Sequence, residues 1–176
     1  PGGDVAINTD LAGAIVENSK YLKDDHLAHL NEHSLEVQIP FLQRFRKDIR
    51  IVPIAMMSMD YAICQDIGHA VARAVKSFKE PVLIVASSDM THYESDKSAR
   101  EKDKKAIDRV LALDPEGLLK TVRENRITMC GVIPATIMLI ACKELGAKKA
   151  ELVDYATSGE TSGDYEQVVG YAGMIV

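Results

Sequence analysis

The stretch Val82-Leu-Ile-Val-Ala-Ser-Ser-Asp-Met-Thr-His-Tyr93 decides the predicted fold, because an apolar run stops in it on hydroxyl, acid and histidine side chains. Residues 82–86 are apolar and mostly β-branched, and Pro81 precedes them, which predicts a short strand buried on both faces. In an open α/β sheet, ligands bind in the crevice at the carboxyl ends of the strands. The alternative is a polar turn in which the acid caps the next element. The crevice interpretation applies to Ser87, Ser88, Asp89 and His92.

The residues before this stretch complete a predicted strand-helix-strand unit. Residues 49–56 read as a strand, although Pro53 suits an edge or a bulge better than a central position. Asp60 is expected to cap a helix that runs through Phe78 with apolar residues at spacings of four. Such a unit crosses over right-handedly in a parallel sheet. We therefore expect an α/β fold, a three-layer αβα sandwich with a mostly parallel or mixed central sheet.

The rest of the chain follows the same style of capped helices and short strands. Thr9 or Asp10 should cap a first helix, and Pro115 and Gly146 should begin and close two later ones. Helices are predicted over 11–18, 35–42, 94–113, 115–125 and 135–145, and two closing strands over 150–155 and 167–176.

Length, composition and charge narrow the class of protein. The 176 residues suit one domain, 1–176, with a real core. A net charge of −5 with mixed signs argues against a nucleic-acid partner, and no apolar run reaches the roughly 18 residues of a membrane span. Three cysteines are too few for a disulfide framework, and no signal peptide is evident, so a cytoplasmic location is expected. The first residue, Pro1, reads as the middle of a loop, which suggests a fragment or a processed piece.

Three histidines, at positions 26, 29 and 33, have the spacing of one helix face and so the pattern of a metal site. The apolar residues between them build no clean amphipathic face, which favours a solvated segment. His33 is of separate interest because Ser34 is a good N-cap for a helix with Glu36 in its first turn. A histidine before a helix N-terminus tends to stay neutral and can act as acceptor or ligand. Pro40 should kink this helix or mark its start nearer to Phe41.

Among the cysteines, Cys130 has the distinctive position. Pro134 belongs in the first turn of a helix, which puts Cys130 at or just before the helix N-terminus, where the thiolate is favoured. Cys64 and Cys142 lie within predicted apolar helices and read as inert structural thiols. The loop Thr157-Ser-Gly-Glu-Thr-Ser-Gly-Asp164 suits either a solvated hairpin or a segment folding over a crevice.

Several motifs together resemble the Memo family, called AmmeMemoRadiSam system protein B in prokaryotes. They fall in the family's order and cover essentially the whole chain. The motifs are Glu32-His-Ser-Leu-Glu-Val-Gln-Ile-Pro-Phe-Leu42, Ser87-Ser-Asp-Met-Thr-His-Tyr93, Met129-Cys-Gly131, Ser158-Gly-Glu-Thr-Ser-Gly-Asp164 and Val168-Val-Gly-Tyr-Ala172. The resemblance implies an extradiol dioxygenase-like α/β fold that holds a non-heme metal, iron or copper with zinc as a further option.

Carried over by position, the resemblance makes Cys130 a metal ligand and places Asp89, His92 and His33 in the same pocket as catalytic residues. The family's two metal-binding histidines belong to motifs that these residues lack. Pro1-Gly-Gly-Asp-Val5 resembles the loop that follows them, so the domain is expected to be N-terminally truncated, lacking roughly its first third. We therefore expect this chain alone to hold no stoichiometric transition metal. The resemblance further implies a radical SAM system partner.

Three classes of function follow from these residues. The first is a metal-dependent redox or dioxygenase-like protein, with Cys130 as ligand and His92, oriented by Asp89, as acid or base. The second is a Cys/His/Asp nucleophilic hydrolase or transferase. The third is a binding module whose crevice holds a peptide or small molecule without catalysis. A homo-oligomer is compatible with each class, whereas nucleic acid and membranes are not expected as partners.

Overall fold

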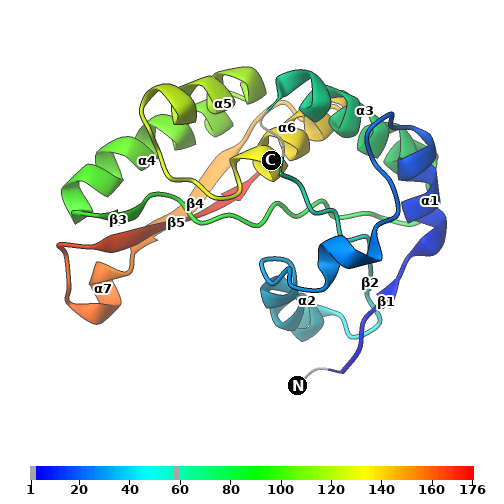
Figure 1. The fold of residues 1–176 in the computed structure, drawn as a ribbon, viewed down its shortest axis with the longest axis horizontal. Coiled ribbons are helices and arrows are strands. Elements are labelled where there is room, and N and C mark those ends of the chain that lie inside the picture. Colours follow the sequence, from blue (N-terminus) through cyan, green and yellow to red (C-terminus); the bar gives the residue numbers. More distant parts are fainter. Residues whose placement is uncertain (1–2, 58–59) are drawn as a thin grey trace.

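The computed structural model describes residues 3–57 and 60–176, and its helices and strands alternate along the chain (Figure 1). The helices are α1 (Thr9–Glu17), α2 (Ile39–Phe45), α3 (Tyr61–Ser77), α4 (Asp96–Leu111), α5 (Pro115–Glu124), α6 (Val132–Leu145) and α7 (Gly159–Ser162). The strands are β1 (Ala6–Ile7), β2 (Arg50–Ile51), β3 (His92–Glu94), β4 (Glu151–Thr157) and β5 (Val168–Ile175). Two short 3-10 helices are η1 (His26–His29) and η2 (Glu36–Gln38).

The strands form two small sheets. β1 and β2 pair in parallel, with Ala6 opposite Arg50. The second sheet has the order β3-β5-β4 and is antiparallel, with a shift of register between Leu152 and Asp154 on β4. The predicted α/β class is confirmed, and so are the two closing strands. The predicted single, mostly parallel central sheet is not formed by the residues that the structure describes.

Residues 82–86 are not assigned to a strand, which corrects the first prediction. The segment crosses the molecule without coiling (Figure 1), and its burial alternates along the chain. Val82, Ile84 and Ala86 pack against the core, but Leu83 and Val85 are 76% and 44% exposed. The segment has one apolar face to the core and one to solvent, because no strand among the described residues pairs with it.

The predicted strand over 49–56 is reduced to β2. β2 pairs with β1 instead of with the segment before β3, so the predicted strand-helix-strand unit is not closed in a sheet. Pro53 has no N–H to donate to a ladder, which is consistent with the early end of pairing.

The core is built chiefly from α3 and α6, which pack closely against each other, with α5 on α6 and α4 on α5. Gly68 in α3 permits the close approach, because a Cβ there would lie 2.6 Å from Cγ2 and 2.7 Å from Cβ of Ile140. α4 also contacts β5, which joins the helices to the antiparallel sheet (Figure 1). One cluster of buried apolar side chains links all of these elements.

Helix boundaries follow local capping chemistry. The side chain of Asp60 accepts a hydrogen bond from Ala62 N at the start of α3, and Asp114 accepts one from Gly117 N beside Pro115, as predicted. Gly146 closes α6 with a φ of 102°, a left-handed conformation that suits glycine.

Two predicted caps are wrong. α1 is capped by Asn8, whose side chain accepts from Leu11 N, and not by Thr9 or Asp10, which lie inside the helix. Ser34 caps no helix, because its hydroxyl and N–H bond to Glu32 instead. The turn η2 and then α2 follow, with Pro40 in the first turn of α2, so Pro40 marks a helix start.

In the two stretches that the structure covers, none of the helices combines the length and apolarity needed to cross a membrane.

We predict that Gly68→Ala destabilises the protein by about 1 to 3 kcal/mol through overpacking against α6. Gly13→Ala in α1 is the matched control, because nothing lies within 4 Å of its added Cβ. The control should gain about 0.5 to 1 kcal/mol from helix propensity. Urea unfolding of both variants measures the two effects. Equal stability changes of the same sign would contradict the close packing of α3 on α6.

Candidate metal site

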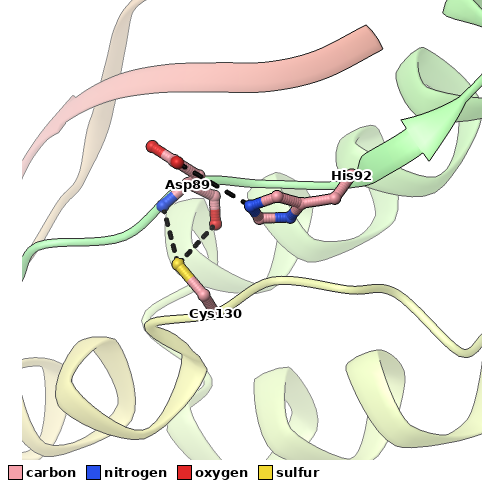
Figure 2. Close-up of side chains that lie close together, drawn as sticks. All are labelled: Asp89, His92 and Cys130. Atoms are coloured by element: carbon pink, nitrogen blue, oxygen red, sulfur yellow. Dashed lines mark hydrogen bonds and ion pairs between the residues drawn. The ribbon is translucent and has the colours of Figure 1, made fainter. Parts of the chain in front are cut away.

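Asp89, His92 and Cys130 converge at one place, although the cysteine is distant in sequence from the other two (Figure 2). One ligand atom from each side chain lies within 4.8 Å of the others. Within 3–57 and 60–176, this is the only group of three or more His, Cys, Asp or Glu side chains with metal-binding geometry. His92 begins β3, Asp89 precedes it, and Cys130 lies just before α6. The three side chains that the sequence placed near a crevice therefore meet.

The imidazole of His92 is oriented by Thr128. His92 Nδ1 lies 2.9 Å from the carbonyl oxygen of Thr128, which can only accept, so Nδ1 carries a proton. The backbone N–H of His92 donates to Thr128 Oγ1 at 2.7 Å. Nε2 then points toward Asp89, 3.7 Å from its Oδ2. That separation is too long for a hydrogen bond, and it leaves Nε2 available to a proton or a metal ion.

The thiol of Cys130 is held by the backbone of Asp89. Asp89 N–H donates to Cys130 Sγ at 3.2 Å, and Sγ lies 3.8 Å from Asp89 O, to which a thiol can donate (Figure 2). The first bond persists when the sulfur is deprotonated, whereas the second requires the thiol proton. Cys130 is exposed, whereas Cys64 is buried and Cys142 is half-buried. Burial raises the pKa of Cys64 and Cys142.

A glycine allows Cys130 to come this close to Asp89. A Cβ on Gly131 would lie 2.2 Å from Ser87 O and 2.4 Å from Ser88 Cβ, which only a missing side chain avoids. Gly131 N–H donates to Ser88 Oγ at 2.9 Å, and Ser88 Oγ donates to Asp89 O at 2.7 Å. The start of α6 is therefore attached directly to the polar end of the 82–93 stretch.

Behind the site, a buried carboxylate fixes the backbone between Asp89 and His92. Asp103, fully buried in α4, accepts from Thr91 N at 2.9 Å and from the hydroxyl of Tyr155 at 2.7 Å. Gly170 makes room for it, since a Cβ there would lie 2.0 Å from Asp103 Oδ2. Burial, and then the bond to Asp103, raise the pKa of Tyr155. This arrangement restrains residues 90 and 91 from the core side.

Other predicted site residues lie apart. His33 is exposed, and in the described part of the chain no hydrogen bond or ion pair joins it to the three converging side chains. Its neighbour Ser34 does reach the region, because Ser34 O accepts from Ser87 Oγ at 2.9 Å. The loop expected at the rim contains α7, which is tied to α4 through Arg100 and Glu160, 2.7 Å apart.

Two features of the site were missed from the sequence. Thr128, whose carbonyl oxygen orients His92, carries no motif of its own beyond its place two residues before Cys130. Asp103 shows a weak signal, because it lies on the same helical stripe as the buried Ala99, Ala106 and Val110. A charged residue on an apolar stripe is usually paired, and here the phenol of Tyr155 is one of its partners.

Fold and site together define an α/β protein with an open pocket of thiol, imidazole and carboxylate. A profile of the family described as "Memo-like protein" matches residues 1–175, and the chain belongs to the Memo family. It is 42% identical to a MEMO1 family protein of Methanopyrus kandleri over 176 residues, covering 99% of this chain and 62% of that protein. A MEMO1 family protein of Aquifex aeolicus is 44% identical over 176 residues, covering 99% and 65%. The chain therefore spans less than two thirds of the length of these relatives.

We predict that Cys130 is alkylated at least about tenfold faster than the other two cysteines in the folded protein, because it is exposed and they are shielded. Timed iodoacetamide labelling with peptide mass mapping measures the three rates. Labelling after denaturation is the control and should make the rates converge. Earlier labelling of Cys64 or Cys142 would contradict the placement of the turn before α6.

A second prediction concerns alkaline pH. Unfolded Tyr155 ionises near pH 10, whereas the folded protein keeps the phenol protonated to higher pH, so its contribution to stability is present below pH 10 and lost above it. Tyr155→Phe should cost about 1.5 to 3 kcal/mol at neutral pH and should flatten the loss of stability above pH 10. Denaturant unfolding between pH 7 and 11 tests this, with Tyr93→Phe as the exposed control. An unchanged alkaline slope in Tyr155→Phe would contradict the bond to Asp103.

Proposed function

We propose that this protein is a Memo-type, metal-dependent redox or dioxygenase-like protein whose pocket is formed by Cys130, His92 and Asp89. The observation that carries the proposal is the convergence of three ligand atoms within 4.8 Å. Because Nδ1 of His92 donates to Thr128 O, the lone pair of neutral Nε2 and the Asp89 carboxylate face each other at 3.7 Å. Such an electron-rich pair is stabilised by a cation between the two atoms.

The donor set fits a transition metal. Metal bonds to imidazole nitrogen and carboxylate oxygen are about 2.0 to 2.2 Å long, so one ion can contact two such atoms that are 3.7 Å apart. Thiolate and imidazole suit iron, copper or zinc, whereas magnesium and calcium prefer oxygen alone. Thr128 supports the fit, because a ligating histidine commonly donates its other ring N–H to a carbonyl or carboxylate.

In this proposal Cys130 is a ligand, and Asp89 and His92 line the substrate side of the pocket. A bound iron or copper ion would supply one-electron or oxygen chemistry. His92 Nε2 is the group that can accept or return a proton, while Thr128 O fixes the ring and the tautomer. Asp89 holds negative charge 3.7 Å away, which favours the protonated imidazole during a transfer.

The Cys/His/Asp hydrolase is less well supported by the geometry. In a catalytic triad the acid contacts the imidazole nitrogen opposite the one that faces the nucleophile. Here Nδ1 contacts Thr128 O, and Asp89 lies on the Nε2 side, the side of Cys130. Asp89 therefore does not occupy the orienting position.

The experiment is a Co²⁺ titration followed by absorption. We propose that the chain binds the ion weakly, with a thiolate-to-cobalt charge-transfer band, and loses it on gel filtration, because it spans only part of the family domain. Cys130→Ser should remove the band, and His92→Ala should weaken binding by about 10 to 100-fold. Cys142→Ser is the matched control and should keep the band.

Two outcomes would change the conclusion. No thiolate band at any cobalt concentration would exclude Cys130 as ligand in this chain. One equivalent of iron, copper or zinc retained after gel filtration would show that Asp89 and His92 themselves complete the coordination, and that the chain needs no further ligand.

A further inference from the structure

The exposed face of residues 81–88 is an apolar strip that lacks a partner in the described residues. Leu83 and Val85 point outward on this strip, while the alternate side chains pack against the core. No backbone hydrogen bond joins 81–88 to another segment anywhere in 3–57 or 60–176. The segment therefore presents both unpaired backbone groups and apolar side chains, the combination that templates the pairing of another strand.

Neighbouring elements enlarge the exposed apolar surface on the same part of the chain. Residues 52–57 also lie outside both sheets, and Met57 is 97% exposed. Residues 34–38, which lead into α2, are tied to the strip through Gln38 Nε2 and Ser34 O, each 2.9 Å from Ser87 Oγ. On α2, Phe41 and Phe45 are 72% and 91% exposed. Clusters of exposed apolar side chains of this kind commonly mark interaction sites.

The length of the relatives indicates what covers the strip. The chain matches 62% of the Methanopyrus relative, so the family domain contains a stretch that these residues do not include. We propose that the strip is the docking surface for an extended segment of that stretch, which pairs with residues 81–88 as an added β-strand. Main-chain bonds would supply affinity, and alternate side chains would cover Leu83 and Val85. The proposal does not depend on metal binding.

A single extended segment suits this position better than a second folded copy. The strip crosses the molecule between the β1-β2 pair and the β3-β5-β4 sheet (Figure 1). The outer edge of β4, where Val153 is 63% exposed, is the more accessible edge for a second copy. The two edges therefore make distinguishable predictions.

The test is reassembly from two polypeptides. This chain is co-expressed with the part of the Methanopyrus relative outside the matched 62%, each with its own tag, and the matched part of the relative serves as the positive control. We expect a 1:1 complex with both partners. Hydrogen exchange should slow at least about tenfold at the amides of 81–88 on complex formation and remain unchanged at 151–154.

Variants locate the surface. Leu83→Lys combined with Val85→Lys places charges on the exposed face only and should weaken the complex by about 100-fold or more. Val153→Lys is the matched control on the edge of β4 and should leave the affinity unchanged. Circular dichroism verifies that both variants stay folded, and the exchange measurement on the unaltered chain is informative even if they do not.

Three results would overturn the proposal. The first is failure of the two polypeptides to form a 1:1 complex. The second is protection that appears at 151–154 instead of 81–88. The third is concentration-dependent dimerisation of this chain alone, with protection of 81–88, which would identify a second copy as the occupant.

Discussion

The crossing of the 89–92 backbone over β5 is the constraint on which the rest of the site depends. Met90 N–H donates to Gly170 O, and Gly170 N–H donates to Thr91 O, each at 2.9 Å. Asp103 fixes the remaining N–H of Thr91 from within the core. Because Asp89 and His92 flank this pinned pair, their positions are set by the packing of α4 and β5, well before any ligand arrives. The site is thus attached to the most rigid part of the chain.

Elements with local signals could be predicted from the sequence. α3, α5 and α6 begin or end where Asp60, Asp114 and Gly146 provide capping, and each boundary depends on atoms only a few residues away. The sheets could not be predicted in the same way. Whether 82–86 pairs as a strand depends on a partner from elsewhere in the fold, and an apolar run carries no information about that partner.

The candidate site was predictable in part for the same reason. Position at a helix start identified Cys130, and position after an apolar run identified Asp89 and His92. Their convergence requires a close approach of two segments that the sequence does not connect, and Gly131 makes it possible by omitting a side chain. Asp103 and Thr128 act through long-range hydrogen bonds, so their roles became evident only from the fold.

The pocket collects electron-rich atoms from groups whose own partners lie elsewhere. Thr128 O takes the Nδ1 proton of His92, and Asp89 N–H supports the sulfur of Cys130, so a lone pair, a carboxylate and a thiol remain directed at one small region. In water such groups would separate, but here the anchored backbone holds them together. The repulsion is relieved by a proton on Nε2 or by a cation among the three groups. A backbone built to hold these atoms close is better explained by a cation than by a surface ion pair, since an exposed Asp-His pair contributes little stability.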